Sequence, residues 1–157
     1  MWLARGMRPA RAMCSVLAGA SSLIALVSWA PLVRAASAVS LNERGQLHLT
    51  SRHGFTLDEQ GSASGSVNGP IYVHLKIVST SRVIAEVNLY PHGGSISGQA
   101  SANYRRGSST ASFAGTISIT RGTGLYAHAH GSGLSFSGTI RRSDEAITVQ
   151  VRGTVIE

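Results

Sequence analysis

Two histidines separated by a single residue, His128 and His130, form the spacing in this sequence that most suggests chemistry. On an extended segment, residues i and i+2 point the same way, so both imidazoles would be able to bind one zinc ion. A zinc site needs a third ligand, and no carboxylate lies nearby in the sequence to orient either ring. We therefore expect no metal site, and His128 and His130 remain weak candidates for ligands.

A glycine-rich segment precedes these histidines. Residues 122–127, GTGLYA, fit the pattern G-x-G-x-x-A of dinucleotide-binding proteins. That pattern binds a pyrophosphate only where a helix follows it, and here the sequence HAHGSG follows. We therefore expect no cofactor, and we interpret Gly122, Thr123, Gly124 and Gly131 as a turn motif in which glycine supplies a positive φ.

Hydrolytic and acid–base chemistry find little support in the sequence. The serine-rich segments 61–65 and 94–98 read GSASG and GSISG, and they lack the central serine of a G-x-S-x-G motif. The acidic doublets Asp58-Glu59 and Asp144-Glu145 are adjacent residues, which point in opposite directions on a strand. We expect both doublets in turns, and no catalytic residue is assigned.

Tyrosines are the remaining candidates for a binding site. If the chain forms a small barrel, the side chains of Tyr72, His74, Tyr104 and Tyr126 are candidates to line its mouth and bind a ligand. The inward positions are mostly Val, Ile, Leu, Phe and Gly. They predict either a filled core or a narrow apolar cavity, and the filled core is the simpler interpretation.

The elements that must position these residues are β-strands. Apolar and polar residues alternate with a period of two from residue 46 onward, while Gly, Ser and Thr are too frequent for stable helices. Turn-forming residues divide the alternating runs. The pattern predicts eight strands, near 46–51, 55–65, 70–79, 82–91, 94–104, 110–120, 132–142 and 145–156.

Eight meandering strands with one apolar face predict an all-β fold, an eight-stranded antiparallel β-barrel, with a two-sheet sandwich as the alternative. Interior glycines such as Gly98, Gly115 and Gly138 favour the strongly coiled barrel. A barrel in the outer membrane is a further alternative. It would need an apolar outer band with aromatic girdles, and Arg82 and Glu86 lie opposite the apolar face.

A resemblance to a known family supports the barrel. The sequence from Phe113 through ITRGTGLYA to Gly131 resembles the G-G-T-G-x-Y/F-x-x-A-x-G signature of the allene oxide cyclase and dirigent superfamily, especially its uncharacterised secreted bacterial members. Arg121 stands where the family usually has glycine. The resemblance implies an eight-stranded antiparallel barrel. None of the family's catalytic or ligand residues can be matched here, so it implies no activity.

The first 38 residues predict a helical signal peptide. They contain four arginines and no acidic residue, and the apolar stretch 15–33 is followed by the small residues Ala36, Ser37 and Ala38. We expect cleavage after Ala38, which leaves residues 39–157 as a barrel domain, secreted or periplasmic and bacterial. An uncleaved membrane anchor is the alternative.

Removal of this segment changes the charge and the cysteine content. Four of the 14 Lys and Arg residues would leave with it, so ten would remain against seven acids, and the net charge would fall from +7 to +3. A charge of +3 spread over the mature domain favours solubility, whereas nucleic-acid binding needs a clustered basic face, so we expect no nucleic-acid partner. The one cysteine, Cys14, lies in the segment, so the mature domain has no disulfide.

These observations favour a non-catalytic module that binds a small apolar ligand or a surface partner, with no stable membrane span once the signal is removed. The alternatives are an enzyme or stereochemical guide of the cyclase/dirigent kind, and a structural protein outside the cytoplasm. The sequence does not determine the oligomeric state.

Overall fold

The computed structural model of the protein describes residues 37–156. The predicted signal peptide therefore falls outside the described residues, apart from its last two positions. No helix in the described part of the chain is long and apolar enough to cross a membrane.

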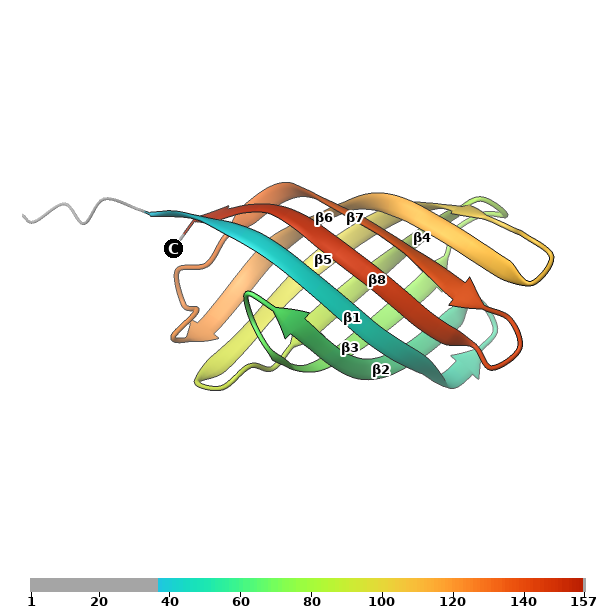
Figure 1. The fold of residues 1–157 in the computed structure, drawn as a ribbon, viewed down its shortest axis with the longest axis horizontal. Helices are drawn as coiled ribbons and strands as arrows, with labels where there is room; N and C mark the ends of the chain where they lie inside the picture. Colours follow the sequence, from blue (N-terminus) through green and yellow to red (C-terminus); the bar gives the residue numbers. More distant parts are fainter. Residues whose placement is uncertain (1–36, 157) are drawn as a thin grey trace, which may run out of the picture. The chain divides into compact units, whose positions relative to one another are not determined.

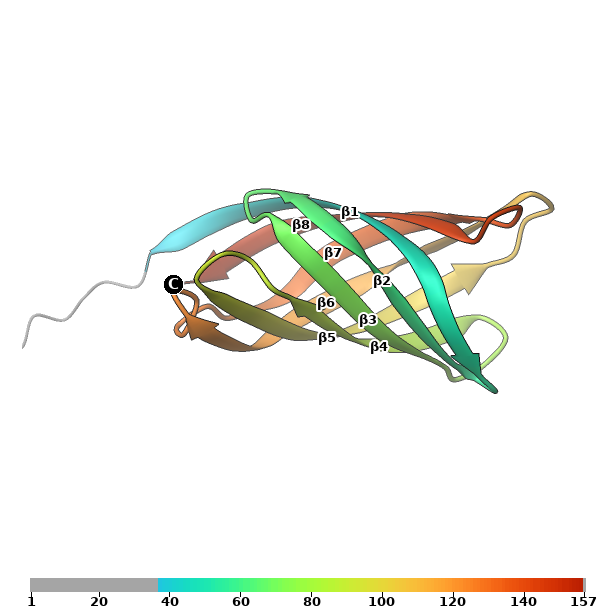
Figure 2. The same ribbon diagram turned by 90° about the horizontal axis from the view of Figure 1, so that it is seen from below.

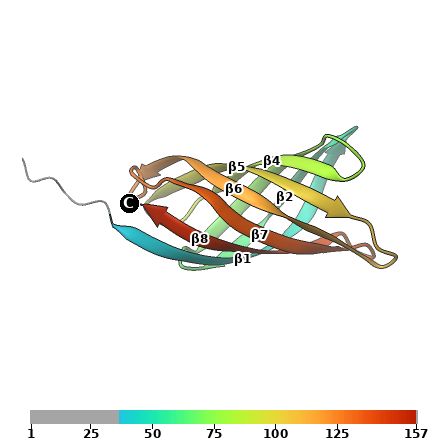
Figure 3. The ribbon, with the colours of Figure 1, turned by 90° about the horizontal axis from the view of Figure 1, so that it is seen from above.

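Residues 37–156 form a closed eight-stranded barrel in which each strand pairs antiparallel with the next (Figure 1). β1 also pairs antiparallel with β8, from Ala38 opposite Ile156 to His48 opposite Ala146, and this pair closes the barrel (Figure 3). The predicted all-β antiparallel barrel is confirmed, and the sandwich alternative is wrong. The strands are β1 (Ala38–His53), β2 (Thr56–Gly65), β3 (Gly69–Ile77), β4 (Arg82–Leu89), β5 (Gly94–Arg105), β6 (Thr110–Gly124), β7 (Gly131–Arg141) and β8 (Ala146–Ile156).

The predicted strand positions agree with the structure to within two residues at each end, with two exceptions: β1 starts eight residues earlier than expected, and β6 ends four residues later. Every second residue of β1 points inward, as in the other strands, but Glu43 and Gly45 occupy two of these inward positions and interrupt the apolar pattern. Both residues are buried. Pairing with β2 on one side and with β8 on the other holds this part of β1 in the barrel, and a local sequence pattern cannot reveal such contacts between strands.

The connections alternate between the two ends of the barrel, because each strand reverses the chain direction. The turns β1–β2, β3–β4, β5–β6 and β7–β8 lie together at one end, which we call the hairpin end (Figures 1 and 2). The start of β1, the end of β8 and the other three connections lie at the opposite end, which we call the terminal end.

The two faces of the barrel wall differ sharply in polarity. On β3, Ile71, Val73, Leu75 and Ile77 point inward, and the residues between them are exposed. The outward positions of the other strands are mostly Ser, Thr, Gln, Asn and charged residues. A barrel that crosses a bilayer has an apolar outer band and a polar interior. This barrel has a polar outer surface and an apolar interior.

Candidate ligand-binding cavity

The barrel interior is hollow, and the expectation of a filled core is wrong. It contains a cavity of about 740 Å³ toward the hairpin end and a smaller one of about 200 Å³ toward the terminal end. Small residues at inward positions are one reason, because Ala85, Ala100 and Ala102 leave space that larger side chains would fill. Ile71, Val87, Ile117, Val149 and Val151 line both cavities and so lie at their boundary.

The wall of the larger cavity is apolar along most of its length. It is formed by inward side chains of all eight strands, among them Leu47, Leu75, Val83, Phe113 and Ile140. Leu47 and Ile147 are buried and form part of a hydrophobic cluster to which Phe113 and Ile140 also belong. Core packing therefore holds the wall in place, and no side chain fills the space that the wall encloses.

One carboxyl group interrupts this apolar wall. Glu59 lies in β2 between Leu49 of β1 and Val73 of β3, and only 7% of the residue is exposed. Burial raises the pKa of its carboxyl to about 7, and no hydrogen bond from residues 37–156 offsets the effect. Burying a polar group without a partner is unfavourable, and the carboxyl of Glu59 has no hydrogen-bond partner among the described residues.

The remaining polar residues of the larger cavity lie at its mouth, on the hairpin end. Arg52, Arg106 and Arg142 line the opening together with Tyr104. Arg52 also forms a long ion pair with Glu145, with 3.6 Å between Nη2 and Oε1. The site therefore has an apolar body, one deep carboxyl group and a cationic rim.

The smaller cavity holds a second buried carboxyl group, that of Glu43. Its Oε1 accepts a hydrogen bond of 2.6 Å from the Val67 backbone N–H, while its Oε2 is buried with no partner in the described part of the chain. Burial raises the pKa of Glu43, and the hydrogen bond from Val67 acts against the increase. The cavity is too small for most ligands, so we assign the site to the larger cavity.

The four residues predicted to bind a ligand do not come together. Tyr72 and His74 point outward from β3: Tyr72 is 5.7 Å from Tyr90 between ring centroids, and His74 Nδ1 lies 2.6 Å from Asp58 Oδ1. Tyr104 lines the larger cavity and Tyr126 the smaller one. Because side chains alternate between the two faces of β3, Tyr72 and His74 lie on the outward face.

The predicted turn motif is only partly correct: Gly122, Thr123 and Gly124 are the last residues of β6, Gly131 is the first of β7, and of these glycines only Gly124 has a positive φ. Gly124 has a φ of 60°, and the Thr123 hydroxyl accepts a hydrogen bond of 3.0 Å from the Ser95 N–H. Gly122 lies so close to Tyr126 that a Cβ there would overlap the Tyr126 carbonyl oxygen. Gly131 begins β7.

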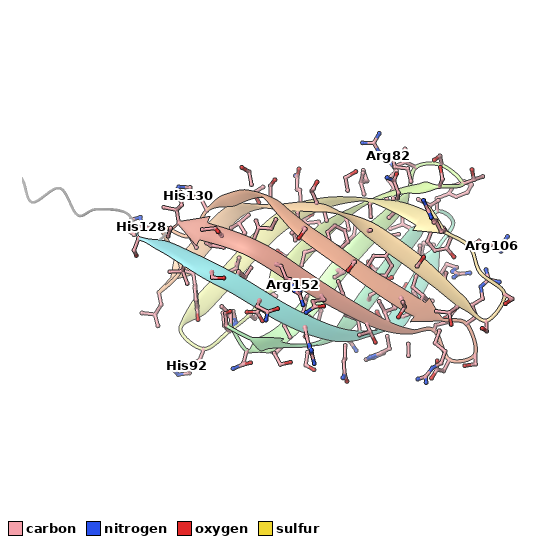
Figure 4. All side chains as sticks on the ribbon, turned by 45° about the horizontal axis from the view of Figure 1, so that its top comes forward. Arg82, His92, Arg106, His128, His130 and Arg152 are labelled. Carbon is pink, nitrogen blue, oxygen red and sulfur yellow. The ribbon has the colours of Figure 1, made fainter. Side chains whose placement is uncertain are left out.

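The two candidate metal ligands lie beside this turn. His128 and His130 are exposed at the terminal end, and His92 lies at the same end (Figure 4). His128 belongs to a turn, not to an extended segment, and its carbonyl lies 2.8 Å from the His130 ring nitrogen Nδ1. Residues 37–156 contain no group of three or more His, Cys, Asp or Glu residues arranged to bind a metal ion.

The doublet Asp58-Glu59 contains the cavity residue that the sequence analysis does not predict. The prediction that its side chains point oppositely is confirmed, but the doublet lies inside β2 and not in a turn. Asp58 faces outward toward His74, and Glu59 faces the cavity. Glu59 follows Leu57 at a spacing of two, and this spacing assigns it to the inward face.

Comparison with family models, with curated proteins and with solved structures finds no match for this chain.

Proposed function

We propose that the protein binds a small apolar ligand inside its barrel, as a non-catalytic module that acts outside the cytoplasm. The observation that supports this proposal is the apolar cavity of about 740 Å³. Its volume falls within the range of known ligand pockets, about 300–1,000 Å³. A single buried carboxyl group, that of Glu59, gives a bound ligand one polar contact that fixes its orientation.

A neutral fluorescent probe tests the proposal directly. N-phenyl-1-naphthylamine is weakly fluorescent in water and bright in apolar sites, so titration with it measures occupancy of the cavity. Ala85 lines the cavity wall, and the substitution Ala85→Phe places a ring in the empty space. Ala114 on β6 is exposed on the outer surface, so Ala114→Phe is the matched control.

The expected result is saturable binding by the wild-type protein, a loss of affinity of about tenfold or more in Ala85→Phe, and unchanged affinity in Ala114→Phe. If both variants bind like the wild type, the probe binds elsewhere, and the proposal is wrong. Thermal unfolding of each variant verifies that the barrel remains folded.

The cavity carboxyl group favours a second candidate function, an enzyme or stereochemical guide of the cyclase/dirigent kind. A carboxyl whose pKa is near 7 can act as a general acid or base at neutral pH. Incubation of the protein with apolar extracts, followed by chiral chromatography, tests this candidate. Product formation that is lost in Glu59→Gln, while probe binding is retained, supports the enzyme; no product with any extract supports the binding module.

The proposed location outside the cytoplasm has its own test. Mass spectrometry of the protein exported by a bacterial host is expected to give an N-terminus at Val39. A cell-associated protein that retains residues 1–38 would contradict the removable signal.

A further inference from the structure

The hairpin end of the barrel combines strong positive charge with exposed apolar side chains. Six arginines, from four strands and two turns, lie at this end, and the only acidic side chains of the turns there are Asp144 and Glu145 among the described residues. Figure 4 shows Arg82 and Arg106 at this end, opposite His92, His128 and His130. The six are Arg52, Arg82, Arg105, Arg106, Arg141 and Arg142.

Most of this charge is not neutralised. Asp144 forms an ion pair with Arg141, with 2.8 Å between Oδ2 and Nη2, and Glu145 forms the long pair with Arg52. Within residues 37–156, no carboxylate lies within ion-pair distance of the other four arginines. Those four are all exposed, so the hairpin end presents a net positive surface to solvent.

Two apolar side chains project from turns at the same end. Phe55 in the β1–β2 turn is 73% exposed, and Val78 in the β3–β4 turn is 55% exposed. Phe55 also lines the larger cavity. Basic residues around exposed apolar side chains are typical of surfaces that bind the interface of an anionic bilayer, because the charges attract lipid headgroups and the apolar groups insert between them.

We propose that the hairpin end docks on the surface of an anionic phospholipid bilayer. The arginines contact the headgroups, Phe55 and Val78 enter the interfacial layer, and the cavity mouth faces the lipid. If the proposed function is correct, an apolar ligand then passes between the bilayer and the cavity without crossing water. The docking itself depends only on the charge and the exposed apolar residues.

Cosedimentation with vesicles tests the charge contribution. The full-length gene is expressed, and the recovered protein is mixed with vesicles of phosphatidylcholine alone or of equimolar phosphatidylcholine and phosphatidylglycerol. The triple variant Arg105→Gln, Arg106→Gln, Arg142→Gln removes three unpaired charges from the hairpin end. The matched control is Arg44→Gln, Arg121→Gln, Arg152→Gln, which changes the net charge equally at exposed positions elsewhere on the barrel.

We expect binding to the anionic vesicles only, weakened by salt. Each arginine near the surface contributes about fivefold, so the hairpin-end triple variant is expected to bind about a hundredfold more weakly. The control triple variant is expected to bind nearly as well as the wild type. Equal losses in both triple variants, or tighter binding to heparin or DNA than to the anionic vesicles, would overturn the proposal.

Tryptophan fluorescence tests the orientation. Phe55→Trp is expected to show a blue shift with anionic vesicles, and Leu125→Trp, at a terminal-end position that is 79% exposed, is expected to show none. A blue shift in Leu125→Trp alone would contradict the docking face. Ala85→Phe distinguishes this proposal from the proposed function, because it is expected to lose the apolar probe and still bind vesicles.

Discussion

The ring of Phe113 on β6 lies against the backbone of Gly138, its cross-strand partner on β7. A Cβ at position 138 would overlap both Phe113 Cζ and the carbonyl oxygen of Thr148 on β8. Phe113 also packs on Phe136, with 5.9 Å between ring centroids, and it lines the larger cavity. The absence of a side chain at Gly138 thus leaves room for an aromatic ring along the cavity wall.

The substitution Gly138→Ala is expected to destabilise the barrel by about 1–3 kcal/mol, because the added methyl group overpacks a site closed by backbone. Urea denaturation of the purified protein measures the change. Ser137→Ala, at the neighbouring exposed position, is the control and should change stability by less than about 0.5 kcal/mol. Equal stability of Gly138→Ala and the wild type would show that the strands are not packed as described.

Glu59 is expected to make stability depend on pH. Burial raises the pKa of its carboxyl from 4.5 to about 7, so the folded protein retains a proton that the unfolded chain loses. The contribution of Glu59 to the free energy of unfolding is fully present below pH 4.5 and is lost as the pH rises through 7. The loss amounts to about 3 kcal/mol at most. Urea denaturation at a series of pH values should show Glu59→Gln gaining stability over the wild type across this range. A constant difference would contradict the raised pKa.

The affinity for a ligand is also expected to depend on the ionisation of Glu59. Above pH 7 the ionised Glu59 faces an apolar cavity, and a neutral ligand would desolvate it further. If the bound ligand raises the pKa of Glu59 by about one unit, N-phenyl-1-naphthylamine binds about tenfold more weakly at alkaline pH than at pH well below 7. Fluorescence titrations over pH measure the effect, and Glu59→Gln should remove it. The same pH dependence in Glu59→Gln would assign it to another group.

The β7–β8 turn contains a strained residue. Glu145 has a φ of 54°, a conformation that favours glycine, and it holds a long, exposed ion pair with Arg52. Glu145→Gly is expected to be about 1 kcal/mol more stable than Glu145→Ala, since both lose the weak ion pair and only glycine relieves the strain. Thermal unfolding compares the two variants; an alanine variant at least as stable as the glycine variant would contradict the strained turn.

The strands could be predicted because their alternation is local. In β3, each inward Ile, Val or Leu is followed by an exposed residue, and burial follows the same period. The beginning of β1 could not be predicted in this way, because Glu43 and Gly45 occupy inward positions and pairing with β2 and β8 places them there. Closure of the barrel depends on pairing between the first and last strands, which lie far apart in the sequence. The sequence pattern indicates closure only through the number of strands.

The site was less accessible to sequence analysis than the fold. Two adjacent acidic residues predict a turn at Asp58-Glu59, although the spacing of Glu59 from Leu57 places Glu59 on the inward face of β2. Whether the interior is filled depends on how the side chains of all eight strands pack together, and no single segment reports this. The arginine doublets at 105–106 and 141–142 lie at the ends of β5 and β7. Only the order of the antiparallel strands brings them to the same opening.

The hollow interior is the central claim, and crystals exposed to xenon under pressure test it most directly. Xenon binds in dry, apolar cavities of proteins. The account predicts xenon density within the barrel beside Leu75, Ala85 and Ala100 on the wall of the larger cavity. A barrel interior closed by packed side chains, with no xenon between β3, β4 and β5, would contradict it.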